Sequence, residues 1–253
     1  MSEQEIQTTK VDPKVDREVR EMLITARVGL LLKATFFGNL ATRLKLVNAD
    51  TWCDTAATDG RNFYYNTEFI KSLKPGEREF LFGHEVLHCV YDHMGRREER
   101  DPQLYNIACD YCVNADLKKH RVGEFITSVD CLYDTKYEGW SSEQVYDDLF
   151  ENAEKIDVEK LLEQLLDEHV DDNANGSGED GESSGDRPTI SAEERKQIRD
   201  EIKEAVLAAA QSSDPGSLPQ GVRRMVQDLV DPQLNWRDLL QVTMQSKIKD
   251  DYT

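Results

Sequence analysis

The feature that most constrains the fold is the run Pro75–Gly95, which carries the pattern His84-Glu85-x-x-His88. Proline at the first position and glycine at the last are typical of the start and end of a helix. Apolar side chains occupy both flanks of this predicted helix, so we expect it to be buried. His84 and His88 then lie one turn apart on the narrow face between the flanks. Because buried imidazoles need polar partners, this face predicts either a metal ion or a pair of hydrogen-bonded core histidines.

The spacing of these residues suits one divalent cation and a water molecule. Two neutral imidazoles leave open positions on a bound ion, and Glu85 projects from the neighbouring side of the helix, where it could accept a proton from a water that the ion acidifies. We therefore predict a zinc-dependent hydrolase with one Zn²⁺ per chain, Glu85 as general base and a protein or peptide substrate. A second donor would polarise the scissile carbonyl, and the candidates are Tyr111, Tyr91 and His93.

Catalytic zinc needs a third protein ligand, and a second predicted helix at Asp101–Leu117 offers one. Asn106, Asp110 and Asn114 recur at every fourth position of this otherwise apolar segment, so they share a face. We predict Asp110 as the third metal ligand, and Asn106 and Asn114 as amides that orient the ligands or a water. The alternative interpretation is an exposed polar stripe.

His93 is the competing candidate for third ligand. In a helix that continues to Gly95, His93 is turned about half a revolution from His84. It could therefore bind the same ion only if the helix ended before it.

Two motifs together resemble a known family: His84-Glu85-x-x-His88 and Asn106-Ile107-Ala108-x-Asp110-Tyr111-x-x-Asn114. The family is a metallopeptidase domain of bacterial and phage proteins that is often followed by a von Willebrand factor A-like module. The resemblance covers most of residues 15–150 and, more faintly, 218–253, and it implies a small zincin core. The sequence has no Asp-x-Ser-x-Ser pattern of the second module, so we expect either a trimmed chain or a member without that module.

The rest of the chain predicts an α+β fold with a mostly helical zincin-like core. Residues 13–46 have helical periodicity, with breaks expected at Gly29 and Gly38. Residues 51–58 and 62–66 read as two strands around an Asp-Gly turn, which places a small sheet or hairpin before the active-site helix. In zincins a strand in this place offers its edge to an extended substrate, and either strand could do so here.

We expect four regions along the chain. They are a disordered N-terminus (1–12), the zincin-like metallopeptidase domain (13–150), an acidic helix and disordered linker (151–190) and a helical C-terminal segment (191–253). The linker is rich in Asp, Glu, Gly and Ser and has too little apolar surface to order itself. The last segment predicts helices from Ser191 to about Ala210, at Leu218–Val230 and at Trp236–Lys247.

Charge and cysteine content restrict the partners and the compartment. The chain has 50 acidic and 31 basic residues and a formal net charge of −19, which argues against nucleic acid or an anionic membrane as a partner. No apolar run is long enough to span a bilayer, and the first residues do not resemble a secretory signal. Five scattered cysteines do not predict a disulfide framework. We expect a soluble, cytoplasmic protein.

A second class of function remains open. The chain could be a non-catalytic binding or assembly module that zinc stabilises and whose helical tail contacts a partner. A structural zinc site is closed by four protein ligands and has no use for a carboxylate at Glu85, so this residue favours the enzyme. A third alternative is a peptidase whose own linker or tail occupies its cleft.

Overall fold

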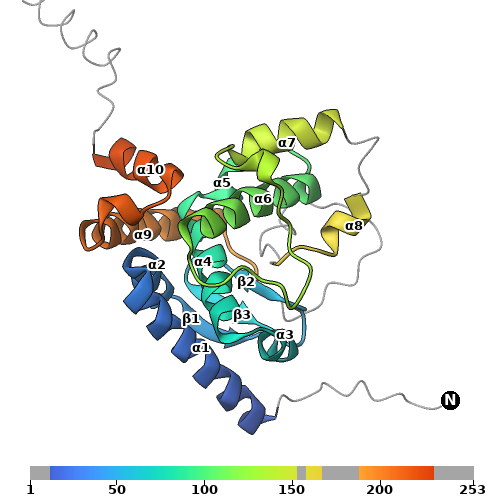
Figure 1. The fold of residues 1–253 in the computed structure, drawn as a ribbon, viewed down its shortest axis with the longest axis vertical. Helices are drawn as coiled ribbons and strands as arrows, with labels where there is room; N and C mark the ends of the chain where they lie inside the picture. The colour runs from blue at the N-terminus through green and yellow to red at the C-terminus, as the bar shows by residue number, and fades with distance from the viewer. Residues whose placement is uncertain (1–11, 153–157, 167–187, 231–253) are drawn as a thin grey trace, which may run out of the picture.

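The computed structural model describes residues 12–152, 158–166 and 188–230, which form ten α-helices and a small three-stranded sheet (Figure 1). This arrangement confirms the expected α+β class. The strands are β1 (Lys45–Asn48), β2 (Ala56–Thr58) and β3 (Asn62–Tyr65). The helices are α1 (Pro13–Lys33), α2 (Thr35–Ala41), α3 (Thr67–Ser72), α4 (Pro75–Val90), α5 (His93–Arg96), α6 (Pro102–His120), α7 (Ser142–Glu151), α8 (Val158–Leu162), α9 (Ala192–Gln211) and α10 (Gln220–Val230).

The prediction of helix over residues 13–46 is wrong in its last part, because Lys45–Asn48 forms β1. The break between α1 and α2 falls at Ala34 and at neither predicted glycine. Gly38 instead allows α2 to pack closely on α1, since a Cβ at this position would overlap the Cα of Leu31. A short apolar run such as the one in β1 fits a helix or a strand equally well, and its pairing with β3 decides between them.

The sheet has the strand order β1-β3-β2, with β1 parallel and β2 antiparallel to β3. The predicted hairpin is confirmed as β2 and β3, although its first strand is shorter than expected. Asp59 closes the turn by accepting hydrogen bonds from the backbone N–H groups of Arg61 and Asn62, and Gly60 supplies a positive φ of 88°. Within this sheet β2 is an edge strand and β3 is central.

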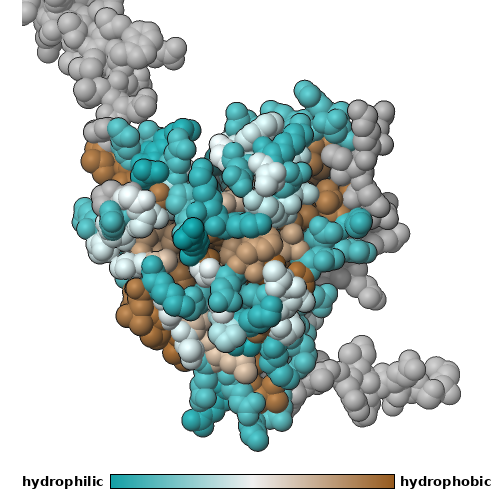
Figure 2. All heavy atoms as spheres, viewed as in Figure 1, coloured by the Kyte–Doolittle hydropathy of each residue, from teal (hydrophilic) through white to brown (hydrophobic). Residues whose placement is uncertain are grey.

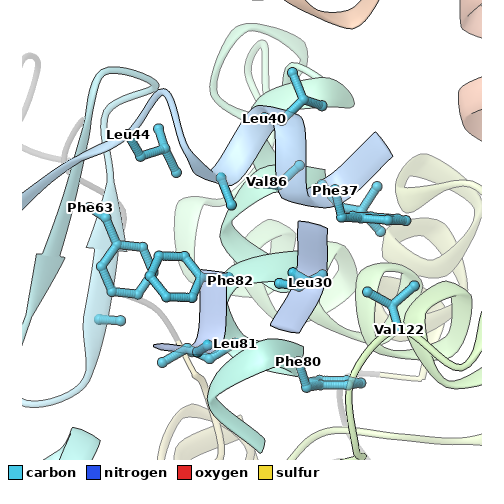
Figure 3. Packing of buried hydrophobic residues seen from close by; sticks show 14 of the residues in the cluster. Leu30, Phe37, Leu40, Leu44, Phe63, Phe80, Leu81, Phe82, Val86 and Val122 are labelled. Carbon is cyan, nitrogen blue, oxygen red and sulfur yellow. The ribbon is translucent and has the colours of Figure 1, made fainter. Parts of the chain in front are cut away.

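Helix α4 passes through the centre of the molecule and is buried on both flanks, as predicted. On one flank Phe82 stacks on Phe63 of β3, with 4.3 Å between the ring centroids. On the other, Phe80 lies in the same buried cluster as Val122 and residues of α1 and α2 (Figure 3). Gly83 lets α6 approach closely, since a Cβ there would come within 2.9 Å of the side chain of Leu117.

Helix α4 ends at Val90, earlier than predicted. Asp92 adopts the left-handed conformation (φ 52°, ψ 43°), which aspartate tolerates better than most residues. Its carboxylate pairs with Arg199 of α9, at 3.0 Å. The turn starts α5 in a new direction, so the expectation that His93 lies on the back of one continuous helix is wrong.

The C-terminal helices α9 and α10 pack on the same core as the N-terminal part. Val206, Leu218 and Val222 are buried and belong to the main apolar cluster. Residues 1–11 of the N-terminus predicted to be disordered (1–12), the linker residues 167–187 and the predicted helix Trp236–Lys247 lie outside the described residues.

Two surface features are visible in the space-filling view (Figure 2). An apolar patch covers part of α1, where Ile24, Val28, Leu31 and Leu32 are exposed. A hollow between α10 and the α6–α7 pair corresponds to a cavity of about 460 Å³. In the described ranges we find no helix with the length and apolarity to cross a bilayer.

Candidate metal centre

Two neighbouring helices bring three buried side chains together. His84 and His88 project from α4 toward Asp110 of α6. Their Nε2 atoms lie 3.6 Å and 3.4 Å from Oδ1 of Asp110. One ligand atom from each residue lies within 4.8 Å of the others, and none of the three residues is more than 1% exposed. These residues could hold a metal ion.

The donor set fits a small divalent cation. Nitrogen and oxygen ligands of tetrahedral zinc lie about 2.0–2.1 Å from the ion, which places neighbouring ligand atoms about 3.3 Å apart. The two observed distances to Asp110 are close to this value. Two imidazoles and one carboxylate also match the ligand number of catalytic zinc sites, which keep one further position for water or substrate.

Asn114 holds the ring of His84. The Nδ2 of Asn114 donates to the backbone carbonyl of Leu132 at 2.9 Å, so its Oδ1 is the atom that faces Nδ1 of His84, also at 2.9 Å. An amide oxygen can only accept, so Nδ1 of His84 carries the proton. The Nε2 lone pair of His84 is therefore available on the side of Asp110.

Asp110 is positioned by the segment after α8, whose contact with the site was not predicted from the sequence. The backbone N–H of Leu166 donates to Oδ2 of Asp110 at 3.3 Å, while Oδ1 faces the two histidines. Leu166 follows α8, is 1% exposed and belongs to the main apolar cluster. It lies in the region predicted as acidic helix and linker, where neither composition nor periodicity points to a contact with Asp110.

Glu85 and Asn106 lie on the same two helices. Glu85 is fully buried beside His84 on α4. Asn106 is one turn before Asp110 on α6 and 6% exposed, and its Oδ1 accepts no hydrogen bond from the described residues.

The three candidate donors for the scissile carbonyl lie in different places. His93 packs against His88, with 3.2 Å between their Nδ1 atoms. The hydroxyl of Tyr91 donates to Oδ2 of Asp116 at 2.6 Å, at the wall of the 460 Å³ cavity. Burial and the negative charge of Asp116 raise the pKa of Tyr91, which therefore stays protonated. Tyr111 packs on Tyr137, with 4.9 Å between ring centroids, in a separate apolar cluster.

Fold and site together define a class: α+β proteins in which two adjacent helices present a buried His-His-Asp group that could hold a metal. The chain belongs to the family described as "Putative metallopeptidase domain", whose sequence profile matches residues 19–253. The resemblance seen in the sequence is thereby confirmed. Membership suggests a hydrolase and implies a peptide substrate. Comparison with curated proteins and with solved structures found no match.

Proposed function

We propose that the protein is a zinc-dependent peptidase in which His84, His88 and Asp110 hold the ion and Glu85 is the general base. The observation that supports this most directly is the approach of both Nε2 atoms to Oδ1 of Asp110, at 3.6 Å and 3.4 Å, beside a buried carboxylate on the same helix. A zinc ion bound there would lower the pKa of a water molecule and polarise the scissile carbonyl.

The residues around the ion have separate tasks in this proposal. The carboxylate of Glu85 accepts the proton of the attacking water and delivers it to the nitrogen of the leaving amine. Asn114 fixes the ring orientation of His84. The buried Oδ1 of Asn106 is an acceptor that can orient a water molecule or a substrate N–H.

A peptide substrate could bind along β2. An extended peptide can add to the edge of a sheet through main-chain hydrogen bonds, and β2 is an edge strand. All three residues of β2 are buried, so the chain that covers this edge would have to move to admit the peptide. The last residue of β2 contacts α4 at the residue that follows His88, since Oγ1 of Thr58 lies 3.6 Å from Sγ of Cys89. A peptide on this edge would therefore run near the helix that carries Glu85.

We place the catalytic unit at residues 13–150, with α9 and α10 packed on the same core. The cytoplasmic location expected from the sequence fits the cysteines, all five of which lie in the described ranges and outside any disulfide.

One observation favours the alternative, a zinc-stabilised binding or assembly module. His84, Glu85, His88 and Asp110 are each at most 1% exposed, as structural metal sites often are. Peptide hydrolysis requires this enclosure to open, whereas a structural role does not.

Glu85→Gln separates the two functions. With zinc-loaded full-length protein and a mixture of unfolded peptides analysed by mass spectrometry, we expect this variant to bind zinc as the wild type does. Its kcat/KM should fall at least about 100-fold, because the proton acceptor is lost.

Glu79→Gln, on the same helix but paired with Lys33, is the matched control and should cleave at the wild-type rate. Cleavage that persists in Glu85→Gln would contradict the assigned base. A zinc-loaded wild type that cleaves no peptide would favour the assembly module.

A further inference from the structure

A chain of polar side chains leads from His88 into the interior behind it. Nδ1 of His88 lies 3.2 Å from Nδ1 of His93, and Nε2 of His93 lies 2.9 Å from Oγ of Ser142, the first residue of α7.

The metal site of the proposed function fixes the direction of both bonds in this chain. Nε2 of His88 faces Oδ1 of Asp110 and would bind the ion, so the proton of His88 belongs on Nδ1. Nδ1 of His93 then accepts this N–H, and His93 donates its own Nε2–H to Oγ of Ser142.

Ser142 and His93 are buried, at 3% and 1% exposure. The chain ends at the wall of the 460 Å³ cavity, to which Ser142 contributes.

The two possible directions have opposite consequences for metal binding. With the direction above, Nε2 of His88 has no proton and presents its lone pair toward Asp110. If the direction were reversed, Nδ1 of His93 would donate to His88, and the proton of His88 would occupy Nε2, the atom that must bind the ion.

We propose that His93 and Ser142 form a directional hydrogen-bond chain that holds His88 in its metal-binding tautomer, and that His93 is a positioning residue and not a metal ligand. This inference rests on the metal site of the proposed function and adds residues that act through His88. His84 is held in a similar way, since Asn114 connects it to the backbone carbonyl of Leu132.

The test measures zinc affinity of the full-length protein by competition with a chelator, with circular dichroism to verify folding. His93→Phe keeps a ring but removes the acceptor, and should weaken zinc binding about 10- to 100-fold. His93→Asn places an amide oxygen near the position of Nδ1 and should restore affinity to within about threefold of wild type.

Ser142→Ala should cause a smaller loss of zinc affinity, of roughly threefold to tenfold. His120→Phe, which changes a histidine at the end of α6, should have no effect.

A spectroscopic measurement reads the tautomers directly. Long-range ¹H–¹⁵N NMR spectra of the histidine rings in metal-free protein at pH 8 should show the proton of His88 on Nδ1 and that of His93 on Nε2. Ser142→Ala should give a mixture of tautomers at both rings. This result is expected of a directional chain and not of simple packing.

Two results would overturn the inference: a folded His93→Phe variant that binds zinc with wild-type affinity, or wild-type protein whose His88 carries its proton on Nε2. If His93→Phe does not fold, the NMR measurement on the wild type decides. A wild type that binds zinc but cleaves no peptide would contradict only the proposed hydrolysis. A wild type that binds no zinc would contradict both proposals.

Discussion

Glu77 shows how a single residue supports the helix that carries the site. This carboxylate is 1% exposed in the first turn of α4. It accepts hydrogen bonds from the backbone N–H groups of Lys74, Thr127 and Ser128, and from the hydroxyls of the latter two. Burial raises its pKa, but the hydrogen bonds from Ser128, Lys74 and Thr127 outweigh burial and lower the pKa to about 2. Glu77 therefore ties the loop after α6 to α4.

This pKa predicts how stability depends on pH. Because the pKa of Glu77 is lower in the folded protein than its usual value of 4.5, the ionised group stabilises the fold above about pH 4.5. That contribution is lost as the pH falls toward 2. Glu77→Gln should lower the free energy of unfolding at pH 7 by about 2–3 kcal/mol. Its stability should also change less than that of the wild type between pH 4.5 and 2.

Urea unfolding at a series of pH values checks this prediction. Glu68→Gln, at an exposed glutamate of α3, is the control and should behave as the wild type does. Equal stability of Glu77→Gln and wild type at pH 7 would show that the buried hydrogen bonds do not stabilise the fold.

At the residue scale, the sequence predicts those parts of the site that follow from helical spacing. His84 and His88 share a face because they are four residues apart, and Asp110 and Asn114 share one for the same reason. The contact of His93 with His88 cannot be predicted in this way. It depends on the left-handed Asp92, whose carboxylate is paired with Arg199, more than one hundred residues further along the chain.

At the element scale, long helices with strong periodicity and clear caps are predictable, and short elements are not. Helix α6 begins after Asp101, whose carboxylate accepts the N–H of Leu104 as expected of an N-cap. Strand β1 was missed because four residues do not define a period, and its partner β3 lies further along the chain. Residues 125–129 form an irregular loop, which is held by its bonds to Glu77.

The segment after α8 provides a prediction at this scale. Leu166 is buried and its N–H contacts Asp110, so this segment helps to enclose the site. In Leu166→Ala we expect the segment to open more readily, because the buried side chain that holds it is truncated. If opening becomes more favourable by about 1.4 kcal/mol, bound zinc should pass to a chelator about tenfold faster. The measurement is the rate of zinc transfer to a coloured chelator in stopped flow.

Leu165→Ala is the matched control for this experiment. Leu165 is the adjacent leucine, but it packs in the separate cluster formed by α6 and α7. Its substitution should leave the release rate close to that of the wild type. Equal release rates for the two variants would mean that Leu166 has no specific part in closing the site.

At the scale of the whole molecule, the N-terminal helices, the sheet and the C-terminal helices share one apolar core around α4. The metal ligands come from two helices in the middle of this core, so a bound ion should stabilise the entire fold. The formal charge of −19 also favours the accumulation of cations near the protein. How the C-terminal helices pack could not be predicted, because their apolar faces do not specify a partner surface.

The most direct test of the account is the zinc content of full-length protein after dialysis against buffer with trace zinc, measured by mass spectrometry of the metal. We expect about one zinc per chain in the wild type and in Glu85→Gln, and less than about a tenth of that in His88→Ala and Asp110→Ala, because two protein ligands hold zinc too weakly. A wild type without zinc, or an Asp110→Ala variant that retains a full equivalent, would contradict the metal centre described here.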